Sequence, residues 1–418
     1  MVKILNVKGR QVFDSRGNPT VEAEVHLDNG ITASAIAPSG ASTGAFEAFE
    51  LRDEDQKYFL GKSVYKAVEN INLKISPLLK NKDPNQQKEI DSLIIKLDSS
   101  ENKCNLGANA ILAVSLAIAK TSAIFNKKPL YKNLGNSFIL PLPLMNIING
   151  GAHADNDLKI QEFMIRPDSA KTFMEAMEKC FLVIQSLKKL LKSKKMLTNV
   201  GDEGGFAPSI SSNEEALSLI VDAINNSKLK PGKDISICLD VAANELINPE
   251  GNYSVKSENF YSVDDTIKYY EKLTSDYPIK SIEDPFAEED WNAWQKLTRS
   301  IGSNVQIVGD DLFVTNKKRL MIGIENRSTN SILIKPNQIG TLTETLEVIN
   351  LAKNSNLTTI ISHRSGDSED TFISDLAVAT ESSQIKTGSL ARSERVAKYN
   401  RLLRIEEELG NSVKIARI

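Results

Sequence analysis

Apolar and polar residues follow two different rhythms in the first part of the chain. Residues 21–26 switch between apolar and polar side chains at every position, and a similar run at 31–36 follows an Asp-Asn-Gly turn sequence. A period of two predicts strands that bury one face, joined here as a hairpin. From 64 to 125 the apolar residues recur at helical spacing instead, which predicts packed helices. We therefore expect a small α+β domain over residues 1–133.

The second part of the chain, residues 134–418, repeats a different unit. A short apolar run of strand length ends in a charged or polar residue, and a helix-length polar segment follows it. These runs are 235–240, 279–283, 305–310, 332–335, 358–363 and 384–386. Strands that alternate with helices form parallel sheets, and six or more such units predict a closed barrel. The expected fold class is α/β, with a smaller α+β domain at the N-terminus.

The last residues of these six runs are all ionisable, and in βα barrels the carboxyl ends of the strands carry the chemistry. Asp240, Glu283 and Asp310 would meet at one rim, where three carboxylates repel one another unless a cation lies between them. Oxygen ligands without histidine or cysteine in the same motifs suit a hard ion such as Mg²⁺. One such acid alone would more often be a solvated residue or a helix cap, but three at successive strand ends favour a metal site.

Two lysines complete the set of strand-end residues. Lys335 follows an apolar run, and partial desolvation beside a metal would lower its pKa enough for it to act as a base. Lys386 is similarly situated, and for both lysines the alternative is a simple ion pair with the neighbouring acids. Residues 362–366 (Ser-His-Arg-Ser-Gly) offer a guanidinium, hydroxyls and backbone N–H groups that suit phosphate or carboxylate.

Three glycine-containing loops carry further candidate side chains. They are the hydroxyl-rich loop 39–44, the loop 149–153 that ends in His153, and the loop 201–205 that holds two acids between glycines. Taken alone, 39–44 is weak evidence and 201–205 is about as consistent with an ordinary turn, and neither of these two loops resembles a P-loop or a dinucleotide-binding fingerprint. Together with the strand ends, they predict a metal-assisted acid/base enzyme that removes a proton beside a carboxylate on a small phosphorylated anion.

Composition limits the cellular setting without changing this picture. Hydrophobic residues make up 41% and charged residues 25% of the chain, and the formal net charge is −3, so we expect neither nucleic acid nor an acidic membrane as a partner. The three cysteines are too few for a disulfide framework. The N-terminus lacks the apolar segment of a signal peptide, and the apolar stretch 110–119, followed by Lys120, predicts a buried helix rather than a membrane span. We expect a cytoplasmic location.

Longer motifs give the chain a specific resemblance. They include PSGASTG, MNIINGGAHADN, NVGDEGGFAP, SIEDPFAEEDW, GDDLFVTN, IKPNQIGTLTET, SHRSGDSEDTFI and QIKTG, spread over nearly the whole chain. In these segments the chain resembles bacterial enolases (phosphopyruvate hydratases). The resemblance implies a modified TIM-type (βα)8 barrel, whose first strands depart from the plain order, beside the smaller α+β domain.

The same resemblance implies an activity. It is the reversible dehydration of 2-phospho-D-glycerate to phosphoenolpyruvate and water in glycolysis and gluconeogenesis. A lysine base together with Mg²⁺ ions that stabilise an enediolate is the known arrangement in the enolase superfamily.

Each candidate side chain takes a role from this resemblance. Two Mg²⁺ ions per active site are implied, with the ligands Asp240, Glu283, Asp310 and, for the second ion, Ser42. Lys335 is implied as the base that takes the C2 proton, Glu203 as the acid that protonates the departing hydroxyl, and Glu162 as the residue that assists Glu203. The residues implied to bind the substrate or neutralise its charge are His153, Glu162, Lys335, His363, Arg364, Ser365 and Lys386.

The resemblance also extends to assembly. It implies a homodimer in which Glu22 of one subunit pairs with Arg404 of the other, or an octamer built from such dimers. Some bacterial members are also displayed on the cell surface or secreted, and many of those bind plasminogen through a C-terminal lysine. This chain ends in Ile418, so we do not expect that role. Lys159 and Arg166, around the Gln-Glu-Phe segment, also depart from the residues usual in the family.

Two other classes of function are compatible with parts of the pattern. A racemase or cycloisomerase of the same superfamily would use three acids and a lysine, but it should lack the PSGASTG loop. A catalytically inactive scaffold or binding protein should lack at least one motif acid or base, and none is missing here. The sequence therefore favours the active enzyme.

Overall fold

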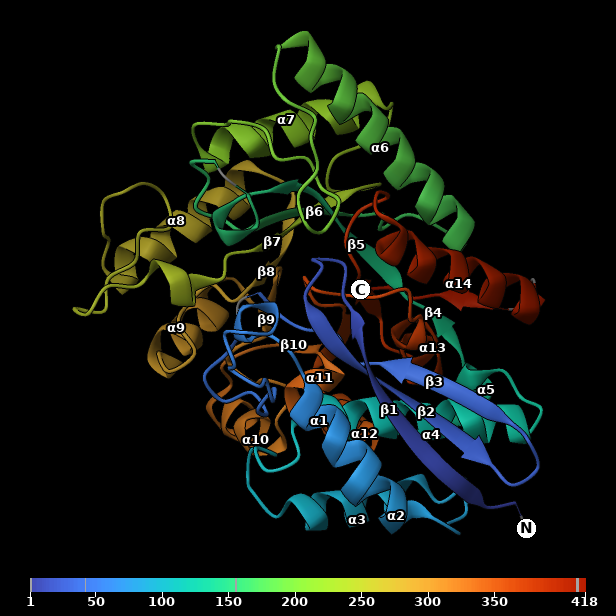
Figure 1. The fold of residues 1–418 in the computed structure, drawn as a ribbon. Helices are drawn as coiled ribbons and strands as arrows, with labels where there is room; N and C mark the ends of the chain where they lie inside the picture. Colours follow the sequence, from blue (N-terminus) through green and yellow to red (C-terminus); the bar gives the residue numbers. More distant parts are fainter. Residues whose placement is uncertain (1, 42, 155, 411–412) are drawn as a thin grey trace.

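The computed structural model describes residues 2–41, 43–154, 156–410 and 413–418 (Figure 1). Its N-terminal part contains a three-stranded antiparallel sheet in the order β1-β2-β3. The three strands are Ile4–Phe13, Pro19–Leu27 and Thr32–Ile36. The alternation at 21–26 is realised in β2, where Val21, Ala23 and Val25 are fully buried against helix α4 (Ala108–Phe125). The other helical segments of this part are α1 (Tyr65–Asn70), a π-helical stretch (Ile71–Ile75), α2 (Ser76–Leu79), α3 (Gln87–Asp98) and α5 (Leu130–Leu134).

Helix α4 is longer than the apolar stretch 110–119, because it continues through Lys120 to Phe125. The Lys120 ammonium reaches out of the core and donates to the Ser34 carbonyl at 3.0 Å and to Asp370 at 2.6 Å. By length and hydropathy, α4 is the one described helix that could cross a membrane, but 83% of it is buried inside the protein. It packs against β2 and β3, as the core helix of a domain does.

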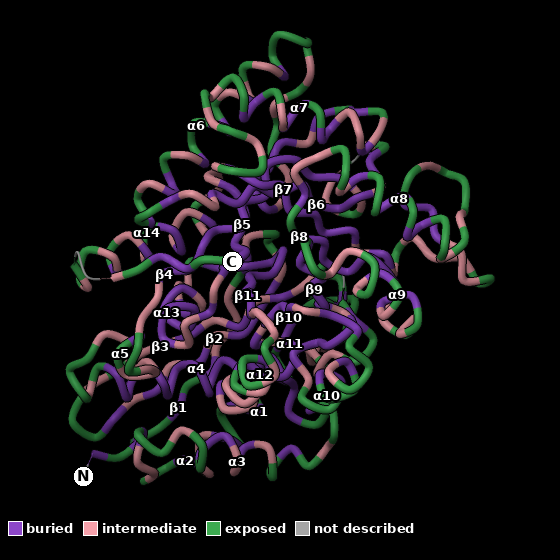
Figure 2. The backbone as a smooth tube through the Cα atoms, turned by 180° about the vertical axis from the view of Figure 1, so that it is seen from behind, coloured by how far each residue is buried: buried purple, intermediate pink, exposed green. Residues whose placement is uncertain are grey.

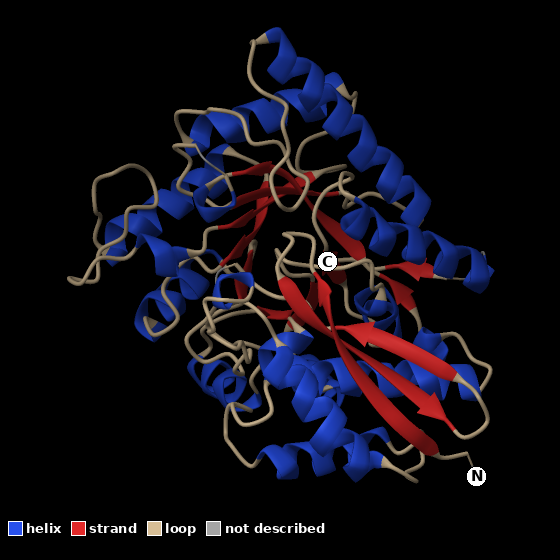
Figure 3. Cartoon of the chain, in the orientation of Figure 1, coloured by secondary structure: helices blue, strands red, loops and turns tan. Residues whose placement is uncertain are grey.

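The second part closes into an eight-stranded barrel, whose strands Figure 3 shows in red within a shell of helices. Its strand order is β10-β11-β12-β5-β6-β7-β8-β9. The strands are β5 (Leu142–Asn149), β6 (Glu162–Arg166), β7 (Ser236–Asp240), β8 (Ile279–Glu283), β9 (Gln306–Gly309), β10 (Ser331–Ile334), β11 (Thr358–Ser362) and β12 (Gln384–Lys386). The six predicted runs form β7 to β12, so the prediction of an α/β barrel is confirmed.

The alternation of strands and helices in the sequence did not predict strands β5 and β6. Strand β6 runs antiparallel to both of its neighbours, and the described residues between β5 and β6 form only a short 3₁₀ turn at Gly151–His153. No helix of crossover length marks this connection in the described residues. The reversal is the departure from plain strand order that the resemblance implied.

Helices cover the outside of the barrel, and Figure 2 shows the buried strands at the centre with exposed helix faces around them. The helices are α6 (Phe173–Ser193), α7 (Asn213–Asn226), α8 (Val263–Asp276), α9 (Trp291–Ile301), α10 (Lys317–Asn326), α11 (Pro336–Ile339), α12 (Leu342–Asn354), α13 (Phe372–Ala379) and α14 (Ser393–Leu409). Several begin where a polar side chain accepts a hydrogen bond from the first helical turn, as Thr172, Ser212 and Thr341 do. Such N-caps satisfy N–H groups that would otherwise lack partners, which fixes the start of each helix.

Inward-facing side chains fill the barrel in layers, because successive residues of a strand point to opposite faces. The middle layer is apolar and forms a cluster of its own, made of Leu144, Met164, Cys238, Val308, Leu333 and Ile360. Two residues away along most of these strands the inward positions become polar. Arg166, Gln306 and Gln384 meet at the end where the parallel strands begin. The acids and lysines predicted from the sequence lie at the opposite end.

Candidate active site

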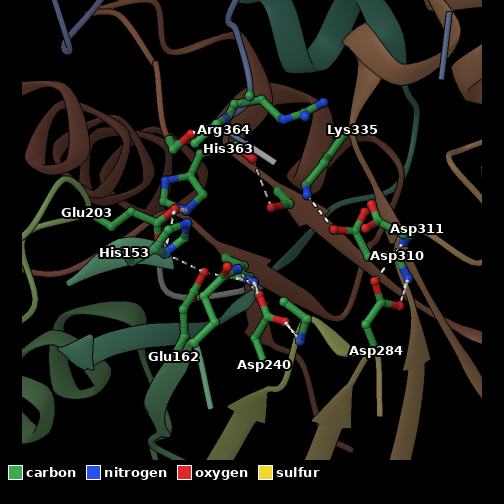
Figure 4. Close-up of a pocket in the computed structure, with 17 residues that line it drawn as sticks. His153, Glu162, Glu203, Asp240, Asp284, Asp310, Asp311, Lys335, His363 and Arg364 are labelled. Carbon is green, nitrogen blue, oxygen red and sulfur yellow. Dashed lines mark hydrogen bonds and ion pairs between the residues drawn. The ribbon is translucent and has the colours of Figure 1, made fainter. Parts of the chain in front are cut away.

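A cavity lies at the carboxyl ends of the parallel barrel strands (Figure 4). Its barrel lining comprises His153, Gln161, Glu162, Glu203, Asp240, Ala242, Asp284, Asp310, Asp311, Lys335, Ser362, His363, Arg364, Ser365 and Lys386. Gly40 and Ala41 of the N-terminal domain line it from the other side. Backbone hydrogen bonds of 2.8 Å in both directions between Ser39 and Gly366 hold the two parts together at the rim. The cavity therefore belongs to both domains.

The predicted acids surround two lysines in this cavity. The Lys386 ammonium lies 2.8 Å from Asp240 Oδ2, 2.9 Å from Glu283 Oε1 and 3.2 Å from Glu162 Oε1. Lys335 forms an ion pair with Asp310. Parallel strands hold these residues together, because Asp240 and Glu283 are register partners on β7 and β8. The structure thus brings Asp240, Glu283 and Asp310 to one rim, with the two lysines between them.

Negative charge is in excess at this rim. Burial and the neighbouring Glu203 hold the pKa of Glu162 well above its ordinary value, and burial and Asp240 do the same to the pKa of Glu283. Burial and the nearby Asp310 raise the pKa of Asp311 to about 7. Buried carboxylates with raised pKa values are typical of a site that can bind a cation.

The tightest all-acid group differs from the predicted triad. Carboxylate oxygens of Asp284, Asp310 and Asp311 lie within 4.8 Å of one another. Asp284 accepts hydrogen bonds from the backbone N–H groups of Asp310 and Asp311, at 2.8 and 2.9 Å, so it holds the loop that carries Asp310. Every donor atom in both groups is oxygen, which fits Mg²⁺. Ser42, predicted as a ligand of a second ion, lies outside the described residues.

The neighbouring carboxylates determine the direction of the pKa shift of Lys335. Burial lowers the pKa of Lys335, but the carboxylates of Asp310 and Glu283 outweigh burial and raise it. The sequence-based expectation of a lowered pKa concerns a lysine beside a bound metal ion, and it stays a prediction.

Two histidines and two glutamates form the opposite wall of the cavity (Figure 4). His153 Nδ1 lies 3.6 Å from Glu162 Oε1 and 4.0 Å from Glu203 Oε1, and His363 Nε2 lies 3.4 Å from Glu203 Oε1. Burial raises the pKa of Glu203, but His363 and His153 outweigh it and hold that pKa well below its ordinary value. The pKa values of Glu162 and Glu203 are thus shifted in opposite directions.

Several polar atoms in this wall lack partners. Within the described residues no hydrogen bond reaches the buried atoms His153 Nδ1, His363 Nε2, Glu162 Oε2 and Gln161 Oε1. A buried polar group without a partner costs about 1–3 kcal/mol, so proteins seldom keep several together without a reason. Their gathering at one cavity indicates that a polar ligand binds there.

The third wall can bind an anion. Arg364 donates to both oxygens of Glu47, at 2.9 and 3.2 Å, and to Asn337 at 3.2 Å. The Ser365 hydroxyl accepts from the backbone N–H of Ala41 at 2.7 Å, so the loop 39–41 of the N-terminal domain closes on this segment. Guanidinium, hydroxyl and backbone N–H groups are the donors that phosphate requires.

Sequence reasoning missed some residues of the cavity. Asp284 and Asp311 each follow a predicted ligand by one position, and strand alternation would turn them away from the cavity. The backbone of Asp284 is left-handed (φ 42°) instead, which redirects the chain after β8. Gln161 adjoins Glu162 and donates to Asp240 at 3.4 Å. Its only sequence signal was its place beside a candidate acid.

Comparison with known proteins agrees with this geometry. The family described as "Enolase, N-terminal domain" matches residues 4–134, and the family described as "Enolase, C-terminal TIM barrel domain" matches residues 137–417. A curated protein named Enolase, from Pelagibacter ubique (strain HTCC1062), is 63% identical over 420 residues, which cover 100% of both chains. The chain belongs to the enolase family.

Proposed function

We propose that this enolase-family lyase catalyses the reversible dehydration of 2-phospho-D-glycerate to phosphoenolpyruvate and water. The observation that carries the proposal is one buried cavity with a lysine on one wall and a pair of glutamates with opposed pKa shifts on the facing wall (Figure 4). A β-elimination needs a base for the C2 proton and an acid for the departing hydroxyl on different sides of the substrate. The cavity provides both.

Mg²⁺ is the cofactor that the donor set supports, with two ions per site in this proposal. Asp240, Glu283 and Asp310 would hold one ion, and Ser42 would contribute to the second. When bound, such ions neutralise the substrate carboxylate and the charge that develops beside it on deprotonation. A cation would also relieve the repulsion that raises the pKa values of Glu283 and Asp311.

The side chains of the protein then divide the work. Lys335 takes the C2 proton at its Nζ once its ammonium proton has been lost, and Lys386 keeps a positive charge beside the carboxylates around it. Glu203 delivers a proton to the departing hydroxyl. Glu162 assists, because its raised pKa keeps a proton close to Glu203. His153, His363, Arg364 and Ser365 orient the phosphate and hydroxyl groups of the substrate.

A homodimer, or an octamer of such dimers, is part of the same proposal. Arg404 is exposed on α14 and forms no ion pair with another described residue. Glu22 lies on β2 and pairs with Arg10 of its own chain. A contact of Glu22 with Arg404 would therefore have to form between subunits. Light scattering of the wild type and of Arg404→Glu tests this, because the charge reversal should shift the protein toward the monomer.

We also propose a cytoplasmic location. The support is limited to the cysteines, since Cys104 is an exposed free thiol and Cys180 and Cys238 are buried free thiols. Free thiols persist in reducing compartments. Fractionation of the source cells would test the location.

The activity itself is tested by adding 2-phosphoglycerate to the purified protein and following the ultraviolet absorbance of the enol product. We expect turnover with Mg²⁺, its loss in EDTA and its return when Mg²⁺ is restored. 3-Phosphoglycerate is the matched control, because its phosphate and hydroxyl are exchanged and no turnover should follow. Full turnover in EDTA would contradict the metal requirement, and no turnover with Mg²⁺ would contradict the function.

A further inference from the structure

A fully buried arginine lies directly behind the histidine wall of the cavity. Arg395 is in the first turn of α14, and its side chain is 0% exposed. Its Nη1 lies 2.6 Å from His363 Nδ1 and donates to the Arg364 carbonyl at 2.6 Å. Its Nη2 donates to the Ser365 carbonyl at 2.6 Å and to the Asp202 carbonyl at 3.2 Å. The four Nη hydrogens therefore each have an acceptor, and one of these acceptors is an imidazole nitrogen.

The contact with His363 has only one chemical interpretation. A guanidinium donates hydrogen bonds and cannot accept them, and it stays protonated at any working pH. His363 Nδ1 must therefore present its lone pair, and the ring proton must lie on Nε2. Nε2 faces the cavity, 3.4 Å from Glu203 Oε1.

We propose that Arg395 is a positioning residue that fixes His363 as a neutral imidazole with its proton on Nε2, directed at Glu203 and the substrate. The catalytic meaning of this assignment rests on the proposed function, whereas the tautomer itself can be measured without turnover. Arg395 does not touch the cavity, since its guanidinium is enclosed by the segments it binds.

The charges around His363 support a neutral ring. The groups that face it are Glu203, Arg395 and Asp367, and the Asp367 carboxylate in turn lies 2.8 Å from the Lys398 ammonium. Burial, with a further contribution from Arg395, lowers the pKa of His363 to about 4, against the opposing effect of Glu203. An imidazolium at this position would hold Glu203 as a carboxylate and deprive it of the proton it must deliver. A neutral N–H donor orients Glu203 without taking that proton.

A purely structural role for Arg395 is the alternative, because the same guanidinium fastens the carbonyls of Asp202, Arg364 and Ser365. The experiment must therefore measure the tautomer and protonation state of the His363 ring as well as the activity. The chain has only three histidines, His26, His153 and His363, so selective ¹⁵N-histidine labelling of the full chain gives a spectrum with few signals. Two-bond ¹H–¹⁵N correlations identify the tautomer and the protonation state of each ring, and His363→Gln assigns the signals.

We expect wild-type His363 to show only the Nε2–H form between pH 8 and about pH 5. In Arg395→Met the Nδ1 atom is released, and the ring should take up a proton at a higher pH than in the wild type, because Glu203 still faces it while the opposing charge of Arg395 is gone. Arg395→Lys keeps one donor and should restore part of the neutral form. Lys398→Met is the matched control, since it removes another buried cation from α14 that touches Asp367 and Ser368 but not His363. It should leave the His363 signals unchanged.

Kinetics provide the second measurement. Arg395→Met should lower kcat by about 10–100-fold at pH 6, with a smaller loss at pH 8 where the released ring is again neutral. A uniform loss at both pH values, with an unchanged His363 spectrum, would mean that Arg395 serves only the backbone and would overturn the proposal. So would a wild-type ring protonated on Nδ1, and this holds even if Arg395→Met does not fold. If the wild type showed no turnover but gave the expected ¹⁵N spectrum of His363, the proposed function would be refuted and the assignment of the tautomer would remain.

Discussion

Buried cations occupy both ends of the barrel interior, but they have different surroundings. Where the parallel strands begin, Arg166 donates to Gln306 and Gln384 at 3.0 and 2.9 Å and pairs with Asp168. Gln306 Nε2 in turn donates a hydrogen bond to Thr358 Oγ1 at 2.7 Å. At the carboxyl end, Lys335 and Lys386 face an excess of acids. Several of the acids there have strongly raised pKa values.

The difference lies in what each end leaves unsatisfied. Among the described residues near Arg166, the buried side-chain atoms without partners are Ser236 Oγ and Gln384 Nε2, both neutral. At the carboxyl end the unpaired atoms include those of the titratable groups His153, Glu162 and His363, which line one cavity. A polar layer that satisfies itself stabilises the fold, whereas a layer whose charges do not balance is built for a ligand. The two ends should therefore respond to mutation in opposite ways.

The largest expected effect is at the base. Lys335→Ala should lower kcat by about 10³–10⁴-fold, because no other described amine approaches the Asp310 side of the cavity. Exchange of the C2 proton of the substrate with solvent, followed by NMR, should disappear as well. The melting temperature of Lys335→Ala should stay close to that of the wild type.

Lys335→Arg is the matched control for this prediction. It keeps a positive charge beside Asp310 but cannot lose its proton. Equal inactivity of the two variants would identify deprotonation as the lost step, whereas substantial activity in Lys335→Arg would mean that only the charge matters. Proton exchange that survives in Lys335→Ala would refute the assignment of the base.

The next effect separates the two halves of the reaction. Glu203→Gln should retain C2 proton exchange while the formation of phosphoenolpyruvate falls by about 10²–10³-fold, since an amide cannot supply a proton to the departing hydroxyl. Both quantities can be read in one experiment from substrate in deuterated water. Glu162→Gln is the comparison, and it should slow dehydration less because Glu162 only assists. Loss of exchange together with dehydration in Glu203→Gln would contradict its role as the acid.

At the other end of the barrel the same kind of change should act on stability alone. Arg166→Met would leave the Gln306 and Gln384 oxygens buried without a donor, at a cost of about 3 kcal/mol in the free energy of unfolding. Urea denaturation measures this cost, and kcat per folded molecule should stay within about twofold of the wild type. The added substitutions Gln306→Leu and Gln384→Leu should recover part of the stability. A large fall in kcat would show that the two ends are coupled and would break the comparison.

Much of the fold could be predicted because repeated units leave a repeated pattern. Strands β7 to β12 each end in, or directly before, a polar residue, and a helix lies between each strand and the next. Strands β5 and β6 could not be found in this way, since the chain reverses between them without a helix of crossover length in the described residues. Their apolar character was visible, but their direction depends on pairing with β7 and β12 across the closed barrel.

The site was predictable only where strand geometry determined it. Asp240 and Glu283 could be paired from the sequence, because neighbouring parallel strands align their ends. The position of Asp284 depends on a left-handed backbone that no residue preference announces. Arg395 lies on a helix whose periodicity indicates only which face is buried, not that its guanidinium meets His363. Glu47 likewise reaches Arg364 from the other domain. Such contacts depend on packing between elements distant in sequence.

The smallest predicted effect concerns charge at the carboxyl end without substrate. Burial and the neighbouring Asp310 raise the pKa of Asp311 from an ordinary value of 3.8 to about 7 in the folded protein, so chelation with EDTA is the condition in which to test it. Between about pH 4 and 7 the folded state therefore holds a proton that the unfolded chain has lost, so the contribution of this group to stability falls as the pH rises. His363, whose pKa is lowered to about 4, contributes in the opposite sense over part of this range. A variant at position 311 is needed to separate the two.

Asp311→Asn removes the titrating carboxyl and leaves His363 unchanged. Relative to the wild type in EDTA, the variant should match the free energy of unfolding at pH 4 and exceed it at pH 8, by at most about 4 kcal/mol for a shift from 3.8 to about 7 at about 1.4 kcal/mol per pKa unit. Saturating Mg²⁺ should narrow or reverse that gap, because a cation stabilises the carboxylates of the wild type. Urea denaturation at the two pH values, with and without Mg²⁺, measures all the terms. If the difference in free energy of unfolding between the variant and the wild type depended on neither pH nor Mg²⁺, the charges at the carboxyl end would be as well balanced as those around Arg166. The contrast between the two ends would then not hold.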